Sequence, residues 1–331
     1  MATNPQTITQ IPPGVQAFYD RNLLARAQPA EVHGRFGQKR PIAKRNGNQI
    51  KFRRYSQLAA ASTPLTEGVS PTGTSLAVTD LTATLAQYGA FITLTDLVSM
   101  TNQDSVVTEA TDVLGDQAGT TIDLARRDVL VAGTAVAYSG TASSRVTVAT
   151  RLVAADLDKA LRTLKVQNGK FIKEGIMPSD GVGTGSVRKS FIAIVHPDTE
   201  FDLEAIVGYR SVSDYGSQEG VMEDEVGAYK NIRFVSSTNA RIFAGGGAAG
   251  TTVFKNNGAN FDVYATLIFA DNAYGVCPLS GEAMQTYVKA LGSAGTADPL
   301  EQRSTVGWKA TTTTRILNDA WMLRIESAAS L

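Results

Sequence analysis

The chain has 331 residues, of which 43% are hydrophobic and 19% are charged, a composition typical of a globular protein that excludes a disordered one. Lysine and arginine together number 31, as do aspartate and glutamate, so the formal net charge is zero, which argues against a protein that binds polyanions through its overall charge. The single cysteine, Cys277, excludes an intrachain disulfide and predicts a buried apolar thiol.

The sequence gives no signal for a membrane. The first ten residues contain neither a basic nor an apolar stretch, so we expect no secretion signal. No run of about 18 apolar residues occurs, so we expect no membrane span. We therefore expect a protein that is made and folded in the cytoplasm. The low share of charged residues predicts that other chains cover part of its surface.

The N-terminal part of the chain is strongly basic over one segment. Residues 1–14 are expected to form a flexible arm and residues 15–27 a short amphipathic helix. Residues 32–66 then contain basic residues and no aspartate or glutamate. Asn46-Gly47 separates two short strand-like stretches, and Asn-Gly is a strong hairpin signal because both residues tolerate positive φ. The segment therefore predicts a projecting basic β-hairpin that needs a partner surface, because it has little apolar surface to bury.

A long helix is the element around which we expect the rest to be organised. Strand patterns over residues 76–87 and 89–94 lead into residues 104–132, where no proline occurs and Asp104 can cap the first free amides. The predicted apolar face consists of Val107, Ala110, Leu114, Ala118, Thr121, Ala125, Val129 and Ala132. Such a helix extends roughly 40 Å. It is either a spine with sheets laid across it or an ordinary long helix in a mixed domain.

The remaining chain alternates between helix and strand patterns. We predict a loop with one or two short strands over residues 133–150, helices over 154–167 and 198–206, and a buried strand over 191–195. Further strands are predicted over residues 230–235, 261–270, 282–289, 306–312 and 320–325, so that the C-terminus rejoins a sheet. Residues 198–225 carry nine acidic residues and one basic residue, Arg210, so the charge of this segment is opposite to that of the basic hairpin. Trp308 and Trp321 are predicted to serve packing.

The sequence shows no machinery for catalysis. His33 and His196 lie far apart without metal-ligand spacing, and we expect structural roles for both. The glycine-rich stretch 181–185 lacks the ending of a phosphate-binding loop. No serine nucleophile elbow, zinc-protease helix or EF-hand loop occurs. Residues 223–225, Glu-Asp-Glu, are more typical of a solvated run or a contact with a basic partner than of a cation site. We expect no enzyme, no cofactor and no metal.

Short segments at both ends of the chain resemble the major capsid proteins of tailed bacteriophages, in particular the podovirus type. They are Ile11-Pro12-Pro13, Phe18-Tyr19-Asp20-Arg21, Val32-His33, Phe36-Gly37, Phe52-Arg53-Arg54-Tyr55, Pro64-Leu65-Thr66-Glu67-Gly68, Gln87-Tyr88-Gly89, Asp96, Asp298-Pro299-Leu300, Gln302 and Val306-Gly307-Trp308-Lys309. These segments occur in the expected order, whereas residues 135–280 are far less diagnostic. The resemblance therefore extends over the whole chain.

The resemblance implies an α+β architecture, the tailed-phage major capsid or Johnson fold, with four parts. They are an N-terminal arm over residues 1–34, an extended E-loop hairpin with its return strand over 35–85, a P-domain over 86–144 and 281–331 with the spine helix 104–132, and an A-domain over 145–280. In some relatives an E-loop lysine forms an isopeptide bond with an asparagine of a neighbouring subunit. Lys44 or Lys51 could take that place, but the sequence marks no partner, and we expect no crosslink.

The resemblance also implies a function through contacts. We expect a major capsid protein that assembles as hexamers and pentamers into an icosahedral shell around double-stranded DNA, which it contacts non-specifically. It would be assembled in the host cytoplasm and remain in the virion. The expected partners are neighbouring copies of itself, together with scaffold, decoration and portal proteins. Two alternatives remain: an encapsulin-like compartment shell, or a nucleic-acid-binding protein using the basic hairpin, against which the zero net charge and the scarcity of aromatic residues among the basic ones stand.

Opposite charges predict where subunits meet. Because the E-loop of the resembled family lies across an adjacent subunit, we expect the basic hairpin to bind carboxylates of a neighbour, with Glu109, Asp112 and Asp116 of the spine helix as rivals to the acidic segment. The predicted contact residues are Arg40, Lys44, Arg45, Lys51, Arg53, Arg54, Glu67, Glu223, Asp224 and Glu225. Each exposed pair contributes only about 0–1 kcal/mol, so several would act together.

Overall fold

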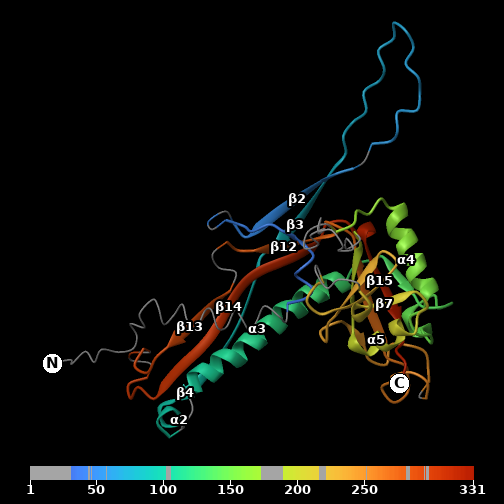
Figure 1. Cartoon of the computed structure of the whole chain (residues 1–331). Coiled ribbons are helices and arrows are strands. Elements are labelled where there is room, and N and C mark those ends of the chain that lie inside the picture. The colour runs from blue at the N-terminus through green and yellow to red at the C-terminus, as the bar shows by residue number, and fades with distance from the viewer. Residues whose placement is uncertain are drawn as a thin grey trace.

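One long helix organises the molecule, with one sheet along its length and a second sheet near its C-terminal end (Figure 1). The structure is a computed structural model. It describes residues 31–331 except 44, 46, 57, 102–105, 173–188, 216–220, 251, 281–283, 294, 296 and 297. The predictions for residues 1–14, 15–27 and the glycine-rich stretch 181–185 lie outside the described residues, as does Lys44.

The long helix, α3 (Val106–Val131), lies against a five-stranded sheet. Its strands are β1 (Gln38–Lys39), β12 (Tyr274–Pro278), β14 (Arg303–Ile316), β13 (Gln285–Lys289) and β4 (Ala86–Thr95). The longest ladder joins β4 and β14, antiparallel, from Ala86↔Thr312 to Thr95↔Arg303. Leu114, Ile122 and Trp308 form the buried core between helix and sheet, and the short helix α2 (Asp96–Thr101) follows β4.

The second sheet has eight strands and holds most of the fully buried side chains. Its strands are β5 (Val136–Tyr138), β15 (Met322–Ser327), β11 (Val263–Phe269), β6 (Phe191–Val195), β9 (Ile232–Ser236), β8 (Glu225–Tyr229), β7 (Tyr209–Ser211) and β10 (Ile242–Phe243). Every residue of β6 and β11 is buried, because apolar clusters cover both faces of these central strands. Helix α4 (Ala154–Val166) packs Leu157, Leu161 and Leu164 into one cluster.

The remaining elements are short. They are helix α5 (Pro197–Glu204) and 3₁₀ turns at Arg145–Thr147, Val212–Asp214 and Asp319–Trp321. The expectation that all of the C-terminal segment 281–331 returns to one sheet is wrong for its end. β13 and β14 lie in the five-stranded sheet, but β15 pairs with β11 and β5 in the eight-stranded one, and β12 of the expected A-domain joins the five-stranded one. The chain thus crosses between the sheets more than once.

A two-stranded arm projects from the body (Figure 1). Its strands are β2 (Gln49–Tyr55) and β3 (Val78–Thr84), antiparallel, and we call residues 49–84 the arm. The predicted hairpin around Asn46-Gly47 is therefore wrong. Gln49–Tyr55 pairs with Val78–Thr84 across a long loop, while Ile42 forms a parallel bridge with Leu279. Long-range pairing has overridden a local turn signal.

The predicted spine helix is confirmed over the described residues 106–131, but its buried face turns along its length. Ala110, Leu114 and Ala118 are buried as predicted. In the second half the buried positions are Ile122, Arg126 and Leu130, one residue after the predicted ones. Steps of four residues advance roughly 40° beyond a full turn, so the face rotates as the helix passes from one sheet toward the other. Asp123 and Arg126 are buried there, which an apolar pattern cannot predict.

Candidate assembly site

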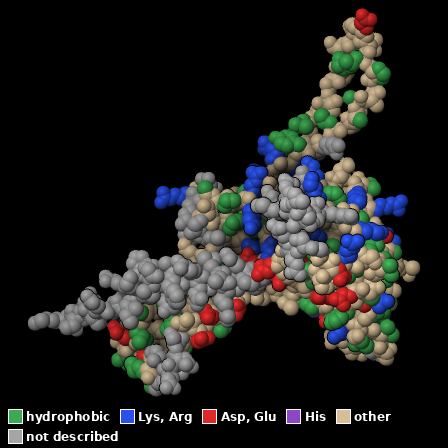
Figure 2. Space-filling model, in the orientation of Figure 1, with side chains coloured by type: hydrophobic (Ala, Val, Ile, Leu, Met, Phe, Trp, Pro, Cys, Tyr) green, Lys and Arg blue, Asp and Glu red, His purple; other side chains and the backbone are tan. Residues whose placement is uncertain are grey.

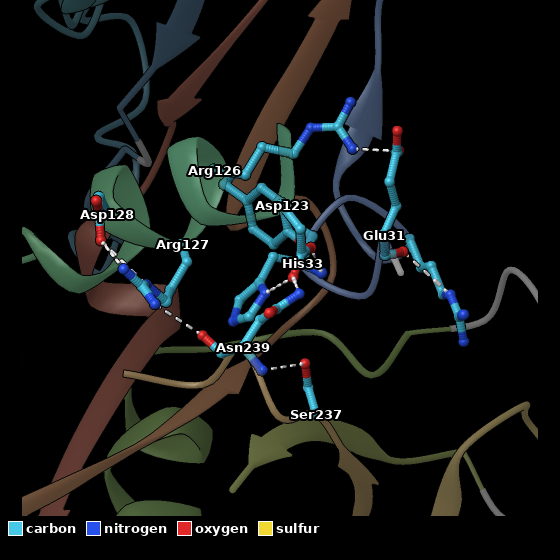
Figure 3. A network of polar contacts seen from close by, with 10 residues as sticks. Glu31, His33, Asp123, Arg126, Arg127, Asp128, Ser237 and Asn239 are labelled. Carbon is cyan, nitrogen blue, oxygen red and sulfur yellow. Dashed lines mark hydrogen bonds and ion pairs between the residues drawn. The ribbon is translucent and has the colours of Figure 1, made fainter. Parts of the chain in front are cut away.

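Three segments meet at the C-terminal half of α3. His33 precedes β1, Asp123 faces it from the helix, and Asn239 follows β9 (Figure 3). Asp123 accepts hydrogen bonds from the backbone nitrogen of His33 at 2.7 Å and from Asn239 Nδ2 at 3.0 Å, and its other contact is His33 Nδ1 at 2.9 Å. His33 and Asp123 are fully buried, and the Tyr274 hydroxyl donates to the His33 backbone oxygen at 2.7 Å. A buried carboxylate with these partners fixes the three segments relative to one another.

Two arginines of the same helix extend this network. Arg126 Nη1 lies 2.5 Å from Glu31 Oε2 and packs against Gly34, where a Cβ would collide with the guanidinium. Arg127 Nη1 donates to the backbone oxygen of Asn239 at 3.0 Å (Figure 3). The helix therefore holds the N-terminal segment on one side and the loop after β9 on the other. The Arg127 contact ties the helix to the eight-stranded sheet, because Asn239 follows β9 of that sheet.

The protonation of this network follows from its geometry. Burial alone would raise the pKa of Asp123, but the hydrogen bonds from His33 and Asn239 outweigh it, and the pKa lies below its usual range. The group is therefore a carboxylate at neutral pH. The described residues contain no group of three or more His, Cys, Asp or Glu side chains able to hold a metal ion. None of the described helices is long and apolar enough to span a membrane.

The second feature is the arm, whose base is polar and whose far loop is exposed. Arg53 Nε lies 3.0 Å from Asp80 Oδ1 across the two strands, so its nearest carboxylate belongs to its own chain. Arg54 Nη1 donates to Asn318 Oδ1 at 2.9 Å and so ties the arm to the end of β14. Every described residue from 58 to 80 is exposed. Hydrophobic side chains line much of the arm, and basic ones gather near its base (Figure 2).

The structure separates the other predicted contact residues. Arg40, Arg45 and Lys51 are exposed, and Glu67 lies in a turn at the far end of the arm. Glu223 and Asp224 are exposed and pair with Arg35 of the same chain at 3.1 and 3.4 Å.

The prediction that Glu225 contacts another subunit is wrong. Its side chain is fully buried against Arg233, whose own side chain is 3% exposed, so it is not available to another subunit. Asp202 is likewise buried and accepts from Ser330 Oγ at 2.7 Å. The acidic run 198–225 is therefore partly internal. The charge pattern alone does not separate these two from the exposed acids, and the partner of Asp202, Ser330, lies 128 residues further along the chain.

Comparisons with solved structures define the class of fold. The chain is similar to the capsid of Ralstonia phage GP4, with a TM-score of 0.68 and 12% identity over 89% of this chain and 88% of that one. It is also similar to the head protein of Helicobacter pylori bacteriophage KHP40, with a TM-score of 0.59 and 14% identity over 90% and 88%. The capsid protein of cyanophage P-SCSP1u gives a TM-score of 0.58 and 13% identity over 89% and 87%. The fold is that of tailed-phage capsid proteins, as the sequence resemblance implied.

Sequence comparison then gives the family. The model of the family described as phage capsid protein matches residues 78–324, which is more than half of the chain. The chain therefore belongs to the phage capsid protein family and is a major capsid protein, a structural component of the virion shell. No curated protein matches it. The match includes β3, the whole of α3, and the strands of both sheets except β1 and the end of β15.

Proposed function

We propose that this capsid protein assembles into hexamers and pentamers of an icosahedral shell that encloses double-stranded DNA, and that the arm is the E-loop by which one subunit holds the next. The observation that carries the proposal is the arm itself. A two-stranded ribbon is at best marginally stable alone, and residues 58–80 are exposed along their whole length. Within an assembly of identical subunits, a surface of the neighbouring copy covers them.

The two sheets support an assignment of the two domains of the subunit. We assign the P-domain to α3 with the five-stranded sheet, and the A-domain to α4, α5 and the eight-stranded sheet. Under this assignment β15 belongs to the A-domain. The buried His33–Asp123–Asn239 network then lies at the junction of the domains and sets the angle between them, which a closed shell requires to be defined.

The basic residues at the arm base remain candidates for contacts between subunits. Arg40, Arg45 and Lys51 are exposed, and each exposed ion pair is worth about 0–1 kcal/mol. Such pairs set register and orientation more than affinity. Scaffold, decoration and portal proteins are further proposed partners, and packaged DNA is contacted without sequence preference. Assembly takes place in the cytoplasm of the host.

Electron microscopy of the purified protein, alone and with a scaffolding protein, tests this function. We expect wild type to form closed shells. A variant in which residues 58–76 are replaced by Asn-Gly should stay folded but unassembled, because it lacks the exposed loop of the arm and keeps both sheets. Normal shells from this variant contradict the role of the arm. Particles isolated from infected cells contain double-stranded DNA, and a protein cargo without DNA would instead indicate a compartment shell.

A further inference from the structure

The tip of the arm presents one carboxylate between two apolar side chains. Glu67 is the only charged residue between Tyr55 and Thr79. The backbone nitrogen of Val69 donates to Thr66 at 3.2 Å, and Gly68 has a φ of +77°, so residues 66–69 form a tight turn with Glu67 at its corner. Leu65 and Val69, which flank the turn, are 77% and 63% exposed. We call residues 65–69 the tip turn.

A cavity at the base of the arm has the complementary character. It has a volume of about 730 Å³ and lies between β3, the end of α3 and the end of β14. Its apolar walls include Leu81, Val129 and Leu317, and two guanidinium groups, those of Arg54 and Arg315, line it as well. Apolar surface beside two guanidinium groups is a suitable environment for a carboxylate that is flanked by aliphatic side chains.

Two acidic residues, Asp128 and Asp319, also line this cavity, and both are already bonded within the chain. Its first carboxylate, Asp128, already pairs with Arg127 at 2.7 Å. The second, Asp319, accepts from the backbone nitrogen and the hydroxyl of Thr134. Arg54 is bonded to the neutral oxygens of Asn318 and Leu317, at 2.9 and 3.4 Å.

The side chain of Arg315 is exposed and forms no hydrogen bond or ion pair with another described residue. Neither guanidinium therefore has a carboxylate of its own chain among the described residues. The tip turn cannot supply one within the chain, because the arm holds it far from its own base (Figure 1). An acidic partner for these two guanidinium groups would therefore come from another molecule.

We propose that the cavity at the arm base receives the tip turn of a second copy, with Glu67 bound between Arg54 and Arg315 and with Leu65 and Val69 against the apolar walls. The inference rests on the proposed self-assembly and names its contact. Each subunit is then held by one neighbour and holds another, so the arms form a continuous ring around a capsomer. Another cavity, of about 590 Å³, is lined by Glu200, Glu204 and Asp224 and would repel Glu67.

A disulfide test in assembled shells measures this contact directly. The chain has one native cysteine, Cys277, which is buried, so it should not compete with the introduced thiols for disulfide formation. Shells of the double variant Glu67→Cys, Arg315→Cys form a ladder of disulfide-linked dimers and higher multimers on oxidation. The matched control Glu67→Cys, Val113→Cys places the second thiol on an exposed part of α3 and stays monomeric. Intact shells without a ladder, an equal ladder in the control, or a crosslink to another protein would overturn the proposal.

Charge exchange gives a second readout that does not require disulfide geometry. Glu67→Arg raises the protein concentration needed for assembly roughly tenfold, as loss of a contact worth about 1.4 kcal/mol would do. Glu67→Arg combined with Arg315→Glu brings it back toward wild type. Wild-type assembly by Glu67→Arg alone, or no recovery in the double variant, contradicts the docking. A wild-type protein that forms no shells at all would contradict the proposed function instead, so the two failures are distinguishable.

Discussion

His33 and Asp123, ninety residues apart in the chain, are bound to each other twice, through the backbone nitrogen and through the ring of the histidine. Asp123→Ala removes the partner of the His33 backbone nitrogen, of the His33 ring and of the part-buried Asn239 amide. We expect the unassembled subunit to lose about 3 kcal/mol of unfolding free energy, because each buried unsatisfied group costs about 1–3 kcal/mol. Urea unfolding measures the loss. Glu109→Ala, at an exposed position of the same helix, should stay within about 0.5 kcal/mol. Equal values for the two variants would contradict the role of the network.

A second buried carboxyl group, that of Asp156, has a pKa that is shifted in the opposite direction to that of Asp123. Asp156 of α4 is 3% exposed, accepts from the Gly140 nitrogen only at 3.4 Å, and lies 3.7 Å from Lys159 Nζ. Burial raises the pKa of this carboxyl despite these partners. Because its folded-state pKa is above the unfolded value of about 3.9, its contribution to stability is full below that value and is lost as the pH rises through the folded pKa.

Asp156→Asn should therefore be at least as stable as wild type at pH 7, and its advantage should disappear as the pH falls through the raised pKa. Urea unfolding of both proteins at a series of pH values measures this difference. The comparison cancels the opposite contribution of Asp123, whose pKa is depressed. A variant that is less stable at pH 7 than at pH 4, each relative to wild type, would show that the carboxylate is stabilised by its neighbours.

One face of the five-stranded sheet buries a large aromatic side chain against α3, and the other exposes one to solvent. Trp308 of β14 is 3% exposed between the sheet and α3, and its Nε1 donates to Gln117 Oε1 at 3.3 Å. The predicted packing role of Trp308 is thus confirmed. Trp308→Ala should lower the unfolding free energy by about 3–5 kcal/mol. Phe91, on the adjacent strand β4, is 71% exposed, so Phe91→Ala should leave the isolated subunit almost unchanged. A similar loss in both variants would mean that the face of Phe91 is also part of the subunit core.

Local periodic signals are enough to predict α3, α4, α5 and most strands, whereas they do not predict α2. The spine helix, α4 and β6 lie within two residues of their predicted ranges where these are described. The thiol of Cys277 is buried as predicted, and burial raises its pKa to about 11. In these segments the period of the apolar residues and the absence of proline are sufficient to predict the type of element.

Features that depend on distant partners were not predictable in this way. The register of β2 follows from its pairing with β3 and not from Asn46-Gly47, and the sheet to which β15 belongs follows from β11. The buried network is not predictable from periodicity, because Asp123 and Arg126 are polar residues that lie outside the predicted apolar face. Their partners, Glu31, His33 and Asn239, could not be named without the fold.

The last prediction separates the two possible partners of Arg53. In the subunit its guanidinium pairs with Asp80 across the arm and lowers the pKa of that carboxyl. If this pair fixes the arm, Arg53→Glu should reduce assembly by placing two carboxylates opposite each other, and Asp80→Arg alone should do the same with two guanidiniums. The double variant should then assemble like wild type, as measured by sedimentation of shells at low and high salt. All three proteins should unfold at the urea concentration of wild type, because the arm lies outside both sheets. Failure of the double variant would instead mean that Arg53 binds a carboxylate of a neighbouring subunit.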